Sequence, residues 1–234
     1  MACGAHNMNM EQKWEAAAAT SKNGAPVIFS DVLYDKIAYA AVGQAGVLNF
    51  FKVPIGAGAT LYGVGPKTLA DTNMDQAGIL SAGEAFLADF LSFRFISGAK
   101  IMQDVVSAVA PVALASPAED EDTFWRKSGG FFEFKYLSKR LAAGDVFRAP
   151  PPVRMSFAAV ASVISDVAAV TEQVEGSTAV PVGHLWQLLH PGVRFDASTK
   201  FSLTMGWNAA VAMPSGLAGV IVAEFNGSRM ERSQ

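Results

Sequence analysis

The chain has 234 residues, of which 51 % are hydrophobic and 17 % are charged, and its formal net charge is −3. This length suits one large all-β domain or two small ones, and the negative charge argues against sequence-independent nucleic-acid binding. The charged share lies below the roughly 25 % of soluble domains. We therefore expect a subunit that buries its outer surface against neighbours; the alternative is a monomer with an ordinary apolar surface.

The single cysteine, Cys3, excludes an intramolecular disulfide. The first ten residues are polar and mixed, unlike a secretory signal peptide. No run reaches the ~18 apolar residues of a membrane span. We expect a soluble or peripheral protein that is compatible with a reducing compartment.

Residues 8–19 combine good helix formers with only one large aromatic side chain, and a polar stretch ending at Gly24 follows them. This pattern predicts a short helix or arm that becomes ordered by contact with something else. We divide the chain into an N-terminal arm, residues 1–24, and a main domain, residues 25–234. Within the arm, Glu11, Lys13 and Trp14 are the candidate assembly contacts.

The first part of the main domain is rich in small residues. A strand is predicted near residues 27–34 and another at 47–53, while residues 36–51 are ambiguous between helix and strand. Residues 63–68 superficially resemble a phosphate-binding loop. The spacing of its glycines before Lys67 and Thr68 is wrong for that motif, so a plain loop is favoured.

The middle of the chain predicts a long strand at 85–96. The apolar phase shifts around Asp89 and Phe90, which indicates either a bulge or a strongly twisted strand. Within residues 100–115 a helix is predicted as far as Ala110, because Pro111 ends it. The four consecutive acids at 119–122 predict a solvated loop, with a cation site as the alternative.

A second strand signal lies at residues 131–137, where aromatic residues alternate with polar ones. Three prolines at 150–152 predict a rigid extended connector. Residues 157–170 have helical spacing, although their β-branched content leaves a strand open. Residues 172–181 read as a polar loop.

The clearest pattern of all is at residues 192–227. Alternation at 193–196 and at 201–207 predicts two strands joined by a polar turn. An apolar β-branched run at 219–225, closed by Asn226 and Gly227, predicts a strand covered on both faces. Together these strands predict an antiparallel β-sandwich.

Catalytic and metal-binding patterns are sparse. The three histidines are His6, His184 and His190, and a cupin-type metal site needs a closer cluster with a carboxylate. Cys3 with His6 would offer only two ligands. Ser215 lies in a turn without a nucleophile-elbow motif. We predict no enzyme activity, no cofactor and no bound metal.

The order of several segments is similar to that of jelly-roll coat proteins of small tailless bacteriophages and related prophage-encoded virion proteins. The resemblance spans roughly residues 50–234. It is carried by Asp71-Thr72-Asn73-Met74, Leu80-Ser81-Ala82-Gly83-Glu84-Ala85-Phe86, Gly129-Gly130-Phe131-Phe132-Glu133-Phe134, Phe201-Ser202-Leu203-Thr204-Met205, Phe225-Asn226-Gly227, Arg229 and Gln234.

This resemblance implies an all-β fold, a single eight-stranded jelly-roll with short helices and an N-terminal arm. It also implies a capsid subunit that is made in the host cytoplasm and assembles with copies of itself, and with other virion proteins, into an icosahedral shell. The chain lacks a basic arm, so we expect no strong direct nucleic-acid binding and an internal membrane or an inner protein layer as the inward neighbour.

Two alternatives belong to other classes of function. A jelly-roll carbohydrate- or receptor-binding module, such as a spike, would use exposed aromatic side chains such as Trp125 or Trp186 to stack on sugar rings. A cupin-like enzyme is the third hypothesis for the function, and it would require a stoichiometric transition metal.

Overall fold

The computed structural model describes residues 27–59, 65–98, 117–146, 156–164, 171–179, 186–187 and 192–231. Strands dominate, as the sequence predicts. They are β1 (Val27–Tyr39), β2 (Gly46–Phe50), β3 (Glu84–Ile96), β4 (Phe131–Tyr136), β5 (Lys139–Asp145), β6 (Ser156–Ile164), β7 (Thr171–Ala179), β8 (Trp186–Gln187), β9 (Val193–Asp196), β10 (Phe201–Trp207) and β11 (Gly219–Glu231). A short helix, α3 (Pro117–Asp122), continues into one π-helical turn, η1 (Thr123–Lys127).

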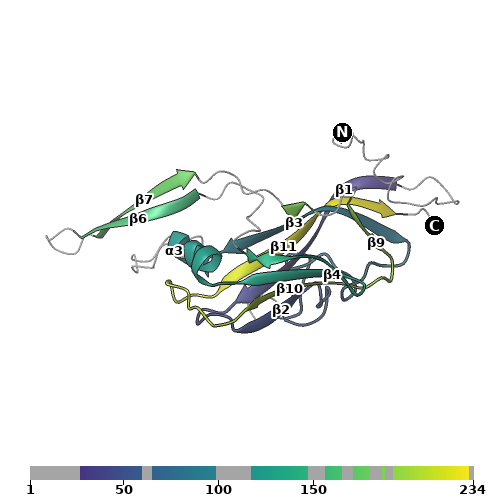
Figure 1. Cartoon of the computed structure of the whole chain (residues 1–234), viewed down its shortest axis with the longest axis horizontal. Coiled ribbons are helices and arrows are strands. Elements are labelled where there is room, and N and C mark those ends of the chain that lie inside the picture. Colours follow the sequence, from purple (N-terminus) through teal and green to yellow (C-terminus); the bar gives the residue numbers. More distant parts are fainter. Residues whose placement is uncertain are drawn as a thin grey trace.

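Two antiparallel sheets form a sandwich (Figure 1). One sheet has the order β1-β11-β3-β8, and β9 pairs with β3 beside β8. The other has the order β2-β10-β4-β5. β6 and β7 pair with each other as a separate ribbon that extends away from the sandwich (Figure 1).

The alternation that predicted β4 and β10 is confirmed. Phe201, Leu203, Met205 and Trp207 are all buried, while Ser202 between them is exposed. In β4 the inward positions are again aromatic and buried: Phe132 and Phe134. The period of two therefore directs one side-chain series of each strand into the space between the sheets.

Aromatic rings fill that space. Phe195 and Phe201 stack with their ring centroids 4.6 Å apart, and Phe95 and Phe124 stack at 4.3 Å. Tyr39 meets Phe124 edge-on at 5.5 Å. Each such pair adds about 0.5–1.5 kcal/mol beyond the burial of apolar area. The core is thus a continuous cluster of rings that holds both sheets together.

Of the two alternatives expected near Asp89, the bulge is present. Asn226 pairs with Phe90 and Gly227 pairs with Ala88, so Asp89 is the extra residue of β3. A Cβ at position 227 would lie 1.9 Å from the Leu87 carbonyl oxygen, closer than any side chain can approach. Glycine at 227 is therefore what lets β11 stay paired with β3 across the bulge.

Three local predictions were wrong. The acidic residues 119–122 lie in α3 rather than in a solvated loop, because buried Asp120 accepts hydrogen bonds from the Ser97 hydroxyl (2.5 Å) and the Ser215 N–H (2.9 Å). Residues 172–181 are not a loop, since most of them form β7. β11 does not end at Asn226-Gly227 but continues to Glu231, because β1 and β3 pair with it on both sides.

Two ambiguous segments resolve as strands. β1 reaches Tyr39, and a turn then leads to β2. Residues 156–164 form β6 rather than a helix. The predicted helix at 100–115, the prolines at 150–152 and the arm, residues 1–24, lie outside the described residues. No helix in the described part of the chain has both the length and the hydropathy needed to span a membrane.

Candidate binding groove at the sheet edges

β1 is an edge strand, and residues 67–73 cover the middle of its outer edge. The Asn73 side chain acts as a substitute peptide group: its Oδ1 accepts from the Tyr34 N–H at 2.9 Å and its Nδ2 donates to the Val32 carbonyl at 2.6 Å. The Lys36 N–H donates to the Asp71 carbonyl at 2.8 Å. An exposed edge can recruit a strand from another chain, and these contacts block that at Val32–Lys36.

A buried ion pair fastens the same covering segment. Asp35 is fully buried, and Lys67 is only 7 % exposed. Lys67 Nζ donates to Asp35 Oδ1 at 2.6 Å and to the Lys36 carbonyl at 2.9 Å, while the Phe51 N–H donates to Asp35 Oδ2 at 2.7 Å. One carboxylate thus joins β1, the end of β2 and the residue 67 segment.

Burial raises the pKa of the Asp35 carboxyl above its ordinary value, because a charge far from water is poorly solvated. The ammonium of Lys67 and the Phe51 N–H act in the opposite direction but do not cancel the effect of burial. The carboxyl therefore holds its proton more tightly in the folded protein than in the unfolded chain.

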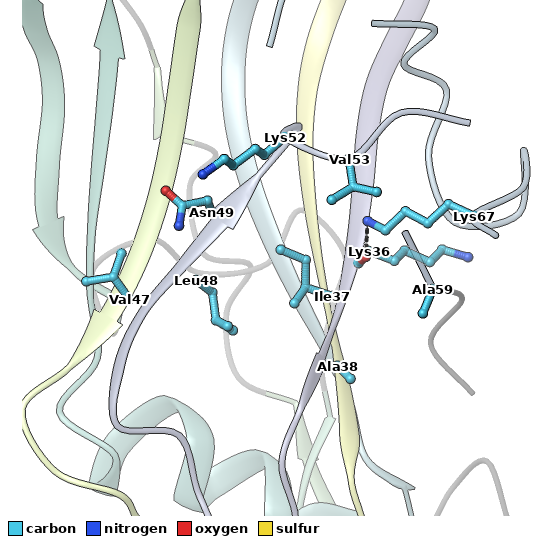
Figure 2. Close-up of a pocket in the computed structure, with 10 residues that line it drawn as sticks. All are labelled: Lys36, Ile37, Ala38, Val47, Leu48, Asn49, Lys52, Val53, Ala59 and Lys67. Atoms are coloured by element: carbon cyan, nitrogen blue, oxygen red, sulfur yellow. Dashed lines mark hydrogen bonds between the residues drawn. The ribbon is translucent and has the colours of Figure 1, made fainter. Parts of the chain in front are cut away.

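Beside this pair, β1 and β2 bound an open groove of about 370 Å³. Figure 2 shows Ile37 from β1 and Leu48 from β2 facing one another across it, with Val53 beyond them. The groove is lined by Lys36, Ile37, Ala38, Val47, Leu48, Asn49, Lys52, Val53, Ala59 and Lys67. Its floor is apolar, and its polar groups are at the rim.

The rim carries two lysines on opposite sides of the groove, Lys36 and Lys52 (Figure 2). Within the described residues neither ammonium has an acidic partner, whereas Lys67 is paired with Asp35. Val47 is 52 % exposed, and β2 pairs with β10 alone among the described strands. Among the described residues the groove therefore offers an unpaired strand edge, an apolar floor and two lysines without acidic partners, which suits an acidic, extended segment of polypeptide.

Most of the residues that sequence reasoning singled out lie outside the described part of the chain. The arm contacts Glu11, Lys13 and Trp14 lie outside the described residues, as do Cys3 and the three histidines. Trp125, the candidate for sugar stacking, is 5 % exposed and meets Phe124 edge-on, with ring centroids 5.0 Å apart. Trp186 lies in β8. No cluster of three or more His, Cys, Asp or Glu side chains suited to a metal occurs among the described residues.

Sequence reasoning missed Asp35 and Lys67. The available signal was position: Asp35 lies two residues after Leu33 and four before Tyr39, both of which are buried, so it occupies an inward site in β1. Lys67 was noticed only as part of a poor phosphate-loop match. Its burial against Asp35 explains why the lysine belongs to the fold rather than to a phosphate site.

Comparison of the chain with protein-family models, with curated proteins and with solved structures finds no match.

Proposed function

We propose that this chain is a jelly-roll capsid subunit that assembles with copies of itself into a closed shell. The observation that carries the fold part of the proposal is the pairing of the strands. We leave the β6–β7 ribbon aside and take β8 and β9 together as one edge strand. The described residues then supply eight strands in order. The first pairs with the eighth, the second with the seventh, the third with the sixth and the fourth with the fifth.

That pairing is what results when one long antiparallel ribbon is rolled into two facing sheets. The roll then has the orders first-eighth-third-sixth and second-seventh-fourth-fifth, which correspond to β1-β11-β3-β9 and β2-β10-β4-β5. Jelly rolls of this kind serve as shell subunits, as lectin-like modules and as cupins. The packing of the interior and the composition of the surface favour one of these three roles.

The interior favours a structural role. A cupin holds its metal between the sheets, and here stacked rings such as Phe195 and Phe201 occupy that space. A lectin-like module would use exposed aromatic side chains to stack on sugar rings, and the candidate Trp125 is buried. A low charge density and a projecting ribbon are features of a subunit that buries its surface against neighbours. We place the protein in a virion, with other virion proteins or an inner layer as further partners.

Light scattering combined with electron microscopy of the purified protein, across concentration and salt, tests the proposal. We expect closed shells, or rings of discrete order, once the protein exceeds a threshold concentration. A monomer or trimer that never grows under any of these conditions would overturn the proposal. It would favour the receptor-binding alternative, which glycan titration monitored by tryptophan fluorescence then examines.

A further inference from the structure

We propose that β7 of one copy adds as a strand to the free edge of β2 in a second copy, in the groove between β1 and β2. The inference rests on the proposed function only in requiring that copies of the chain associate. It names the contact through which they do so: an acidic edge strand of one copy and a basic-rimmed strand edge of the next.

The β6–β7 ribbon is the first half of the argument. Both strands are nine residues long, and each pairs with the other alone among the described strands. The ribbon extends away from the sandwich, with β6 beside α3 and β7 on the outer side (Figure 1). A two-stranded ribbon is at best marginally stable in water, whereas a third strand makes it robust. The outer edge of β7 is where a third strand can pair.

The edge of β2 is the second half. The neighbouring edge strand β1 is covered by Asn73 and Asp71, which hydrogen-bond to its backbone. β2 has no such cover from the described residues, and its segment Gly46–Phe50 contains neither a charge nor a proline, the usual devices that protect an edge. Of the two adjacent edges, that of β1 is thus blocked, while that of β2 lies beside an apolar groove and is covered by no segment that the structure describes.

Charge identifies β7 as the occupant. β7 contains Glu172 and Glu175 and no basic residue, whereas β6 contains no charged residue at all. The groove rim presents Lys36 and Lys52. Pairing of two β2 edges about a twofold axis would bring these lysines of both copies together, and that repulsion disfavours a symmetric contact. Pairing of β7 with β2 opposes negative to positive charge.

Because each copy donates a ribbon and receives one elsewhere, the contact is head-to-tail and generates rings or larger assemblies.

Cross-linking between copies gives the direct test. In a Cys3→Ser background, Val47→Cys and Val174→Cys are introduced into separate preparations, which are mixed and treated with a short thiol-reactive cross-linker. We expect a covalent dimer from the mixed preparations. The matched control replaces Val47→Cys with Lys200→Cys, at an exposed turn, and is expected to give no dimer above background.

Charge reversal gives the second readout. Glu172→Lys with Glu175→Lys, or Lys36→Glu with Lys52→Glu, should each raise the concentration required for association by roughly tenfold or more, and the fourfold variant should recover association. Lys139→Glu with Lys200→Glu changes the net charge equally at exposed sites and should have little effect. A circular dichroism spectrum checks that each variant folds.

The outcomes separate this inference from the proposed function. Shells that form without the Val47–Val174 cross-link, and that tolerate both charge reversals, would overturn the inference and leave the shell function intact. Cross-linked head-to-tail copies that form neither closed shells nor rings of discrete order would support the inference and overturn the shell function. A protein that neither cross-links nor associates would overturn both.

Discussion

At the scale of single residues, the Asp35–Lys67 pair makes a sharp prediction. Lys67→Met removes the cation and leaves a buried carboxylate with fewer partners, which should lower the free energy of unfolding by about 3–5 kcal/mol. Urea denaturation measures the change. Asp35→Asn combined with Lys67→Met removes both charges and should recover most of the loss.

Lys52→Met is the matched control, because Lys52 lies in the same groove but is exposed and unpaired among the described residues. Its effect should stay within about 0.5 kcal/mol. Equal urea midpoints for Lys67→Met and the unmodified protein would contradict the assigned role of the pair.

The raised pKa of Asp35 makes the free energy of unfolding depend on pH. Because the folded-state pKa lies above the ordinary value, the contribution of this carboxyl to stability is complete below the ordinary pKa and is lost as the pH rises through the folded-state value. Lys67→Met should raise the pKa further, since it removes the favourable cation. Its cost in stability should therefore shrink as the solution is acidified toward the ordinary carboxyl pKa. Urea titrations at several pH values check this, and a cost that grows on acidification would contradict it.

At the scale of elements, Asn73 is expected to protect the edge of β1. Asn73→Ala leaves the Tyr34 N–H and the Val32 carbonyl without these partners, which should cost about 1–3 kcal/mol. Amide hydrogen exchange should accelerate at Tyr34. Asn49→Ala, at an exposed position of β2, is the control and should leave exchange at Tyr34 unchanged. Unaltered exchange in Asn73→Ala would show that the edge is protected by other means.

The elements that sequence predicted well are those in which one face is buried and the other is wet. β4 and β10 can be predicted from the sequence because Phe132 and Phe134 in β4, and Phe201 in β10, belong to apolar series that repeat with the strand period. β7 and the outer part of β11 do not, because their pairing is set by partner strands rather than by local hydrophobicity. α3 was missed for a related reason: only tertiary contacts turn Asp120 inward, toward Ser97.

At the scale of the whole molecule, composition and strand pattern suffice to predict an all-β sandwich, but not its binding groove. The groove is made by β1 and β2, which belong to opposite sheets and meet only after the chain has turned between Tyr39 and Gly46. No motif encodes such a surface, since its parts are ordinary residues such as Ile37 and Leu48. The binding role proposed for the lysines at its rim follows from their placement around the groove and not from any local sequence pattern.

The last prediction concerns the arm. Residues 1–24 precede β1, and the residues that the structure describes already form a core cluster between the two sheets. Deletion of the arm should therefore leave the urea midpoint of the domain within the range of surface substitutions, while shell formation is lost because Glu11, Lys13 and Trp14 are removed. Paired measurements of denaturation and electron microscopy separate folding from assembly. Substitution of Trp14→Ala alone should reproduce the assembly defect in part. Shells of unchanged size from the truncated chain would refute the assigned role of the arm and leave the contact between β7 and β2 as the remaining source of order between copies.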